Sequence, residues 1–163
     1  MFFEKLFKQL NKKKIKYMVI GGVAVNLHGF PRTTGDLDIL ISLKPNNVRK
    51  FIQLVKSLKW KPKIPVHVEE FANPKTRKAW IQEKGMKVFS VYNPKNQFEH
   101  LDIMVENYID FESAFHNKKV ISAGTVKVPV ISIKDLIKLK KIAGRERDII
   151  DINALIQIKE LSE

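Results

Sequence analysis

The segment from Val19 to Ile41 places two aspartates inside a hydrophobic stretch that is otherwise typical of a buried strand. It reads VIGGVAVNLHGFPRTTGDLDILI, and only Leu37 separates Asp36 from Asp38. A carboxylate buried among apolar side chains costs several kcal/mol unless a partner neutralises it. The fold must therefore bring a cation or hydrogen-bond donors to this strand.

Asp36 and Asp38 would project from the same face of a β-strand, because side chains alternate with a period of two. Two adjacent carboxylates repel each other, and a divalent cation held by oxygen ligands, Mg²⁺ or Mn²⁺, relieves that repulsion. Asp102, in the apolar segment EHLDIMV, could complete the site if its strand pairs beside the first. The predicted metal ligands are therefore Asp36, Asp38 and Asp102. The alternative is that the pair lies exposed on an edge strand.

Two glycines, Gly21 and Gly22, end the preceding hydrophobic run and come before a predicted helix from Val23 to His28. Glycine permits a sharp turn, and the N–H groups at a helix start can face an anion. A glycine pair alone is a weak signal, since a structural turn needs no function. Combined with the paired carboxylates, it predicts binding of a nucleotide's phosphates. The segment is not a P-loop, because the chain lacks G-x-x-x-x-G-K-[ST].

Hydrophobic periodicity predicts a mixture of helices and strands along the chain. The predicted helices are 2–12, 23–28, 45–58, 76–83, 110–116, 132–143 and 145–158, and the predicted strands are 17–20, 36–42, 87–92, 98–105, 120–121 and 125–130. Residues 60–85 show a less regular pattern, interpreted as a proline-rich connection before the short helix. We expect one α/β (α+β) domain over residues 1–163, with a mixed central sheet flanked by helices. Its core would span about 15–131 and its C-terminal helices about 132–160.

The chain has 163 residues, of which 44% are hydrophobic, and it contains no cysteine. This length suits one domain, and the absence of cysteine excludes disulfides and thiolate metal sites. No apolar run reaches the ~20 residues that span a bilayer. Charged residues interrupt the N-terminal segment, which is therefore unlike a signal peptide. We expect a cytoplasmic location and no membrane association.

The balance of charge is strongly basic, with 30 lysines and arginines, 17 aspartates and glutamates, and a net charge of +13. Such a field favours polyanionic partners such as RNA, DNA or nucleotide phosphates. Compositional drift in an AT-rich genome would also produce many lysines. The four histidines are scattered, without the spacing of a zinc site.

The glycine pair, the Asp-x-Asp pair and the later carboxylate together resemble the DNA polymerase β-type nucleotidyltransferase superfamily. Its hallmark is a Gly-Gly or Gly-Ser turn, a spacer, Asp-x-Asp and a third acidic residue on a later strand. The segment also resembles the branch of AbiEii-type toxins and small nucleotidyltransferase-like proteins, in which Arg-x-Thr leads into Asp-x-Asp, here at Arg32 and Thr34. The resemblance implies a minimal nucleotidyltransferase fold, with Arg32 and Thr34 in nucleotide binding.

The C-terminal segment ISIKDLIKLKKIAGRERDIIDI adds a second resemblance to the same branch, in which a lysine precedes Ala-Gly-Arg and Arg-Asp on consecutive helices. Lys140 borders the apolar side of its predicted helix, where its ammonium group needs an aspartate or a phosphate, unless it extends to solvent. Arg145 could bind a triphosphate or pair with a carboxylate near the helix junction. Arg147 and Asp151 have the spacing of an i,i+4 pair. The resemblance implies nucleotide binding by Lys140 and Arg145.

These features support one principal hypothesis, a metal-dependent nucleotidyltransferase that moves an NMP from an NTP to a hydroxyl acceptor. The resemblance implies that Asp102 positions or activates that hydroxyl. The candidate acceptors are an RNA such as a tRNA end, a partner protein and a small molecule, and the branch suggests a toxin–antitoxin context. The alternative is a catalytically silent nucleotide-binding or regulatory module of a toxin–antitoxin pair.

Overall fold

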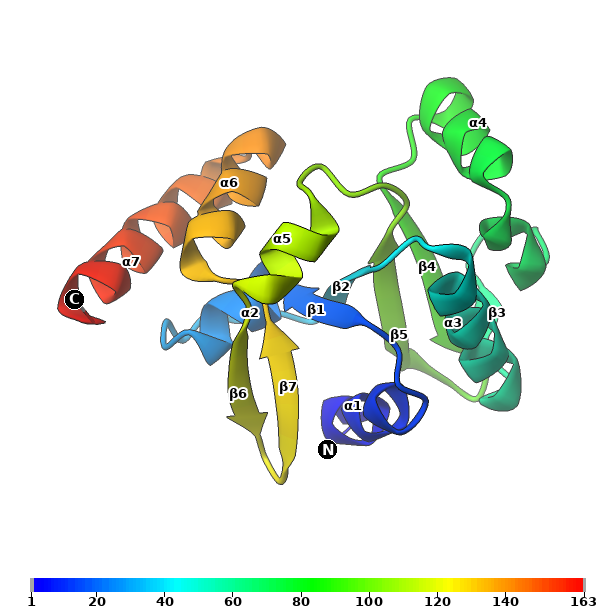
Figure 1. Ribbon diagram of the computed structural model, residues 1–163, viewed down its shortest axis with the longest axis horizontal. Coiled ribbons are helices and arrows are strands. Elements are labelled where there is room, and N and C mark those ends of the chain that lie inside the picture. Colours follow the sequence, from blue (N-terminus) through cyan, green and yellow to red (C-terminus); the bar gives the residue numbers. More distant parts are fainter. Residues whose placement is uncertain (1, 163) are drawn as a thin grey trace.

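The computed structural model describes residues 2–162, which fold around one mixed sheet of seven strands in the order β3-β4-β5-β2-β1-β7-β6 (Figure 1). The strands are β1 (Tyr17–Ile20), β2 (Leu37–Ile41), β3 (Lys61–Pro62), β4 (Val88–Asn93), β5 (Asn96–Met104), β6 (Lys119–Ala123) and β7 (Val126–Val130). The helices are α1 (Phe2–Lys12), α2 (Gly21–Leu27), α3 (Pro45–Ser57), the 3₁₀ helix η1 (Val68–Ala72), α4 (Pro74–Lys84), α5 (Phe111–His116), α6 (Ile133–Ala143) and α7 (Glu146–Ser162). The predicted α/β architecture is confirmed.

The centre of the sheet joins strands that are far apart in the sequence. β2 pairs with β5 in parallel and with β1 in antiparallel orientation, and β1 pairs with β7 in parallel. The parallel register sets Asp38 directly opposite Asp102 and Leu37 opposite Leu101. The strand pairing that the sequence left conditional is therefore present.

The helices begin and end where local chemistry favours it. Pro45 occupies the first turn of α3, which suits its fixed φ angle. The Ser132 hydroxyl accepts a hydrogen bond from the Asp135 N–H at the start of α6, and Gly144 ends that helix in the left-handed conformation, at φ +64°. α6 and α7 lie together at one end of the molecule, with α4 at the other (Figure 1). No helix among residues 2–162 has the length and hydrophobicity to cross a membrane.

Several predicted boundaries differ from those of the structure, and three of the differences bear on the site or on the middle of the chain. α2 begins at Gly21, so the two glycines are the first residues of that helix and not a turn before it. β2 begins at Leu37, which leaves Asp36 just outside the strand. The connection expected over residues 60–85 contains β3, η1 and an α4 that begins at Pro74. β3 has only two residues and η1 five, too few to give a clear period, and the Asn73 side chain caps α4 earlier than the apolar pattern indicated.

An aromatic cluster fixes η1 and α4 against the sheet. Phe89 of β4 is fully buried, and its ring stacks on Phe71 of η1 at 4.9 Å and on Trp80 of α4 at 5.3 Å between centroids. Stacked rings at such distances add to the stabilisation that burial alone provides. The cluster explains why a segment without a regular hydrophobic pattern is still held in place.

We expect Phe89→Ala to lower the free energy of unfolding by about 3–5 kcal/mol, because it leaves a cavity between two rings. Urea unfolding of the purified protein measures this change. Phe98→Ala is the matched control, since the Phe98 side chain is 88% exposed. Equal losses in the two variants would contradict the assignment of Phe89 to the core.

Candidate active site

A pocket of about 630 Å³ contains all nine of the site residues that the sequence predicted. They are Gly21, Gly22, Arg32, Thr34, Asp36, Asp38, Asp102, Lys140 and Arg145. The carboxylates come from the central sheet and its entry loop, and the cations come from that loop and from α6 and the α6–α7 junction. The pocket therefore has an acidic side and a basic side.

On the acidic side, burial and neighbouring carboxylates oppose the ionisation of Asp38. Burial, reinforced by the charges of Asp102 and Asp36, raises the pKa of Asp38 to about 6. The charges of Arg145 and Lys140 act in the opposite direction but do not cancel the shift. Because these two charges do not cancel the shift, an additional positive charge beside Asp38 would stabilise its ionised form.

Two neighbours of these carboxylates were not predicted. The Nε2 atom of His100 lies 2.5 Å from Asp36 Oδ1, and the Ser90 hydroxyl donates a hydrogen bond of 2.5 Å to Asp102 Oδ1. His100 precedes Asp102 by two residues on β5, so the alternation of side chains along a strand could have identified it as a neighbour on the same face. Ser90 lies opposite Asp102 on β4, a pairing that depends on register and has no local signal.

The donor set fits a divalent cation in its chemistry. The three carboxylates offer oxygen ligands, which Mg²⁺ and Mn²⁺ prefer, and the raised pKa of Asp38 indicates charge that such an ion would relieve. Within residues 2–162, no three acidic or histidine side chains are already gathered for a metal. Asp36 is held by His100, and Asp102 by Ser90. To bind one ion together, the three carboxylates would have to come closer to one another.

The glycines at the start of α2 allow close approach of the acidic strand and its entry loop. A Cβ on Gly21 would collide with the Asp38 carboxylate, and one on Gly22 would lie 2.6 Å from the Thr34 hydroxyl oxygen. Gly21 also has φ +67°, a conformation that favours glycine. Ile20, at the N-cap, offers no side-chain acceptor to the first N–H groups of the helix. Both glycines line the pocket.

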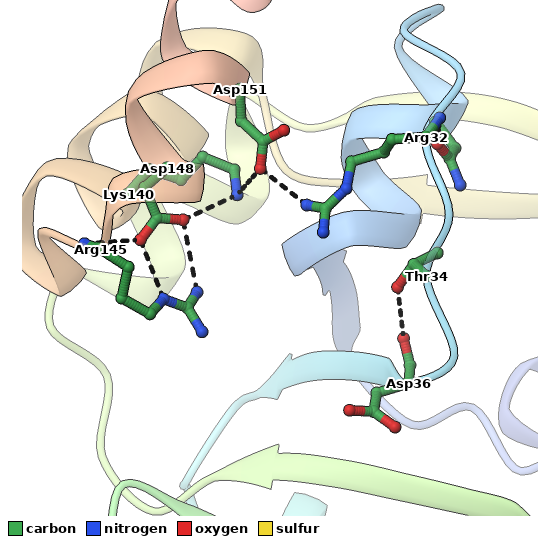
Figure 2. Close-up of polar contacts among 8 residues, drawn as sticks. Arg32, Thr34, Asp36, Lys140, Arg145, Asp148 and Asp151 are labelled. Atoms are coloured by element: carbon green, nitrogen blue, oxygen red, sulfur yellow. Dashed lines mark hydrogen bonds and ion pairs between the residues drawn. The ribbon is translucent and has the colours of Figure 1, made fainter.

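The basic side is an ion-pair network in which two buried aspartates of α7 hold three cations (Figure 2). Lys140 Nζ lies 2.9 Å from Asp151 Oδ2 and 3.3 Å from Asp148 Oδ1. Arg145 Nε lies 2.9 Å from Asp148 Oδ2, and Arg32 Nη1 lies 2.7 Å from Asp151 Oδ2. Of the alternatives left open by the sequence, Lys140 and Arg145 thus contact carboxylates.

The predicted pair between Arg147 and Asp151 was wrong. Asp151 is buried and bonds to Arg32 and Lys140, whereas Arg147 is exposed at the rim of the pocket. The i,i+4 spacing alone does not tell which face of α7 is turned inward. That face carries Asp148 and Asp151, three residues apart and therefore neighbours on the helix surface.

The network shows strong mutual stabilisation of its charges. Although burial acts to raise it, the pKa of Asp148 is lowered by hydrogen bonds from Arg145 and by the charge of Lys140. Three cations against two carboxylates leave one positive charge in excess. The basic wall can therefore attract an anion even while its internal pairs are intact.

Residues 2–162 match a family described as a nucleotidyltransferase of unknown function, DUF6036. The chain belongs to this nucleotidyltransferase family. Membership confirms the resemblance to the nucleotidyltransferase superfamily and makes the chain a nucleotidyltransferase. The narrower resemblance to the AbiEii-type branch stays a prediction. A search of curated protein sequences finds no match.

Solved structures of nucleotidyltransferases share the fold. The lincosamide antibiotic adenylyltransferase LnuA, with lincomycin bound, matches with a TM-score of 0.63 and 18% identity over 96% of each chain. An antigenic nucleotidyltransferase-like protein from Paracoccidioides brasiliensis matches with a TM-score of 0.59 and 19% identity, over 96% of this chain and 72% of that one. The antibiotic-resistance factor ANT(2″)-Ia matches with a TM-score of 0.58 and 11% identity, over 96% and 81%. At these identities, the similarity establishes the predicted minimal nucleotidyltransferase fold.

Because its pKa is higher in the folded than in the unfolded chain, Asp38 stabilises the fold at low pH and loses that contribution as pH rises through about 6. The wild type should therefore lose at most about 3 kcal/mol of its free energy of unfolding between pH 4 and pH 7, in buffer with a chelator. We expect Asp38→Asn to abolish this loss. Urea unfolding across this range measures it. Glu160→Gln, on the exposed side of α7, is the control. Parallel pH profiles for wild type and Asp38→Asn would contradict the expectation.

Asp151→Ala should lower the free energy of unfolding by about 3–5 kcal/mol, because it leaves the buried Lys140 and the half-buried Arg32 short of a partner. Thermal and urea unfolding measure the loss. Glu69→Ala breaks the exposed pair with Lys56 and should cause no measurable change. An Asp151→Ala variant as stable as Glu69→Ala would show that the network does not hold α7 in place.

Proposed function

We propose that this chain transfers a nucleoside monophosphate from an NTP to a hydroxyl acceptor, with Mg²⁺ or Mn²⁺ bound. One observation carries the proposal: Asp38 and Asp102 lie in register on parallel strands, in a pocket whose other wall contains Lys140 and Arg145. Carboxylates suit a metal ion and cations suit phosphates, so the pocket has both of the charged surfaces that nucleotidyl transfer requires. Membership of a nucleotidyltransferase family supports the same reaction.

In this proposal Asp36, Asp38 and Asp102 hold the metal. When bound, the ion supplies positive charge that polarises the α-phosphate. The carboxylates would contribute the hard oxygen ligands that orient it, and ionised Asp38 would gain a positive charge in addition to those of Arg145 and Lys140.

The phosphates would lie between the start of α2 and the basic wall. The N–H groups of Gly21 and Gly22 donate to phosphate oxygens, and Thr34 and Arg32 lie beside Gly22 to complete that side. Arg145, whose side chain is 54% exposed, can turn toward the leaving pyrophosphate. Lys140 lines the same pocket but is bound to two aspartates, so it acts on the nucleotide through its charge.

The acceptor oxygen attacks the α-phosphorus, the bond from that phosphorus to the oxygen bridging the β-phosphate breaks, and pyrophosphate leaves. Asp102 takes the proton of the acceptor hydroxyl as general base. Its Oδ1 atom accepts a hydrogen bond from Ser90, which orients the carboxylate. Ser90 is thus a positioning residue for this step.

Three classes of acceptor are candidates. The net charge of +13 favours an RNA end such as that of tRNA, and a hydroxyl of a partner protein in a toxin–antitoxin context is the related alternative. A small molecule is favoured by the match to LnuA, an antibiotic adenylyltransferase, over 96% of both chains. The pocket of about 630 Å³ is also within the usual range for small ligands. The cytoplasmic location stays a prediction.

Incubation with each α-labelled NTP, MgCl₂ and a cell extract, followed by separation of RNA, protein and small molecules, tests the proposal. We expect label in one of the three fractions, and a decrease of about 10²-fold or more in Asp102→Asn. Glu83→Gln, an exposed residue of α4, is the control and should label as the wild type does. NTP binding without any labelled product would instead favour the silent module. Absence of NTP binding with either metal would contradict both.

A further inference from the structure

A second cavity of about 340 Å³ lies between α4 and the residues that follow β2 and β5. Leu43, which follows β2, Val105, which follows β5, and Ile81 of α4 form an apolar part of its wall. The cavity shares no lining residue with the active-site pocket. It lies at the carboxyl ends of two parallel strands, where open α/β sheets commonly bind ligands.

The cavity contains a buried arginine without an acidic partner. The Arg77 side chain lines it, and the residue is only 7% exposed. One guanidinium nitrogen, Nη1, donates to the Phe71 carbonyl oxygen at 2.6 Å, and the group lies 5.4 Å from the Phe71 ring centroid. Among the ion pairs of residues 2–162, none includes Arg77. This differs from Arg32 and Arg145, which each contact an aspartate.

Arg77 lines the cavity, and of its guanidinium nitrogens only Nη1 has a hydrogen bond to the described part of the chain. Within the described chain, the only buried side-chain nitrogen or oxygen atoms that lack a hydrogen-bond partner belong to His100 and Asn107. The Arg77 nitrogens without a hydrogen bond are therefore not sealed inside the protein. Since Arg77 lines the cavity, we infer that they are accessible from it. A cation that has lost most of its hydration and has no counter-charge favours an incoming anion.

The charges around the cavity restrict which anion fits. Lys78 adds a second positive charge, whereas Glu106 places a carboxylate in the same wall. Glu106 also contributes, after burial, to a raised pKa of Tyr108, so it lies near that hydroxyl. One negative wall residue disfavours polyanions such as an NTP or RNA, and the apolar wall favours a ligand with a hydrocarbon part.

We propose that this cavity binds a small monocarboxylate, with its carboxylate on the Arg77 guanidinium and its aliphatic chain against Leu43, Ile81 and Val105. A guanidinium can hold a carboxylate by two parallel hydrogen bonds, and the cavity volume suits a ligand of a few carbon atoms. This site is independent of the proposed nucleotidyl transfer. If Arg77 instead serves only to hold Phe71, no carboxylate will bind.

The first test is an amide NMR titration of the full chain, without nucleotide, using sodium hexanoate and hexanol. We expect hexanoate, up to about 10 mM, to cause saturable shifts at Leu43, Ile81 and Val105. Hexanol, which has the chain but not the charge, should bind at least tenfold more weakly. Equal binding of the two, shifts centred elsewhere, or no saturable shift with hexanoate would overturn the proposal.

Variants then test the role of the guanidinium. Arg77→Gln should weaken hexanoate binding at least tenfold, and Lys84→Gln, an exposed cation of α4 that does not line the cavity, should change it less than twofold. Arg77→Lys keeps the charge without the fork and should lose affinity too; it replaces Arg77→Gln if the latter fails to fold. Wild-type affinity in a folded Arg77 variant would overturn the proposal. NTP binding, measured on the same samples, should be unchanged, which separates this test from that of the proposed reaction.

Discussion

The parallel pairing of β2 with β5 is the constraint on which the rest of the site depends. It sets Asp38 opposite Asp102 in the centre of the sheet, where burial and mutual repulsion raise the pKa of Asp38 to about 6. Such a pair is costly to an isolated sheet, so the fold must supply positive charge nearby. Lys140 of α6 and Arg145 of the α6–α7 junction lower the pKa of Asp38 but do not cancel its rise. A bound metal ion would supply further positive charge, so the pocket is suited to one.

The cations of the basic side are in turn held by aspartates that α7 directs inward. Asp148 and Asp151 are buried while Ile149 and Ile150 are about 60% exposed, the reverse of the usual arrangement in a surface helix. The aspartates are tolerated there because Lys140, Arg145 and Arg32 neutralise them. One network thus attaches the C-terminal helices to the loop before β2, so the basic wall of the pocket is also a structural joint of the fold.

Sequence reasoning located the pocket because its key residues break a local rule. A charge in an apolar strand and a lysine beside an apolar helix face both stand out without knowledge of the fold, and all nine predicted residues line one pocket. Ser90 and His100 did not stand out, since their contacts depend on the register of β4 with β5 and on the position of Asp36 outside its strand. The Arg147–Asp151 pair failed for a related reason, because spacing does not fix how a helix is rotated against its neighbours.

The exposure of the three paired cations indicates how far each can respond to a nucleotide. Lys140 has 5% of its side chain exposed and two carboxylate partners, so moving it would leave each buried aspartate with one cation fewer. Arg32, at 21%, shares Asp151 with Lys140, and its loss would leave that aspartate with one partner. Arg145, at 54%, can exchange its contact with Asp148 for a phosphate while Lys140 still neutralises the aspartate. The network therefore divides into a buried inner part that supports the fold and an outer arginine whose side chain is half exposed.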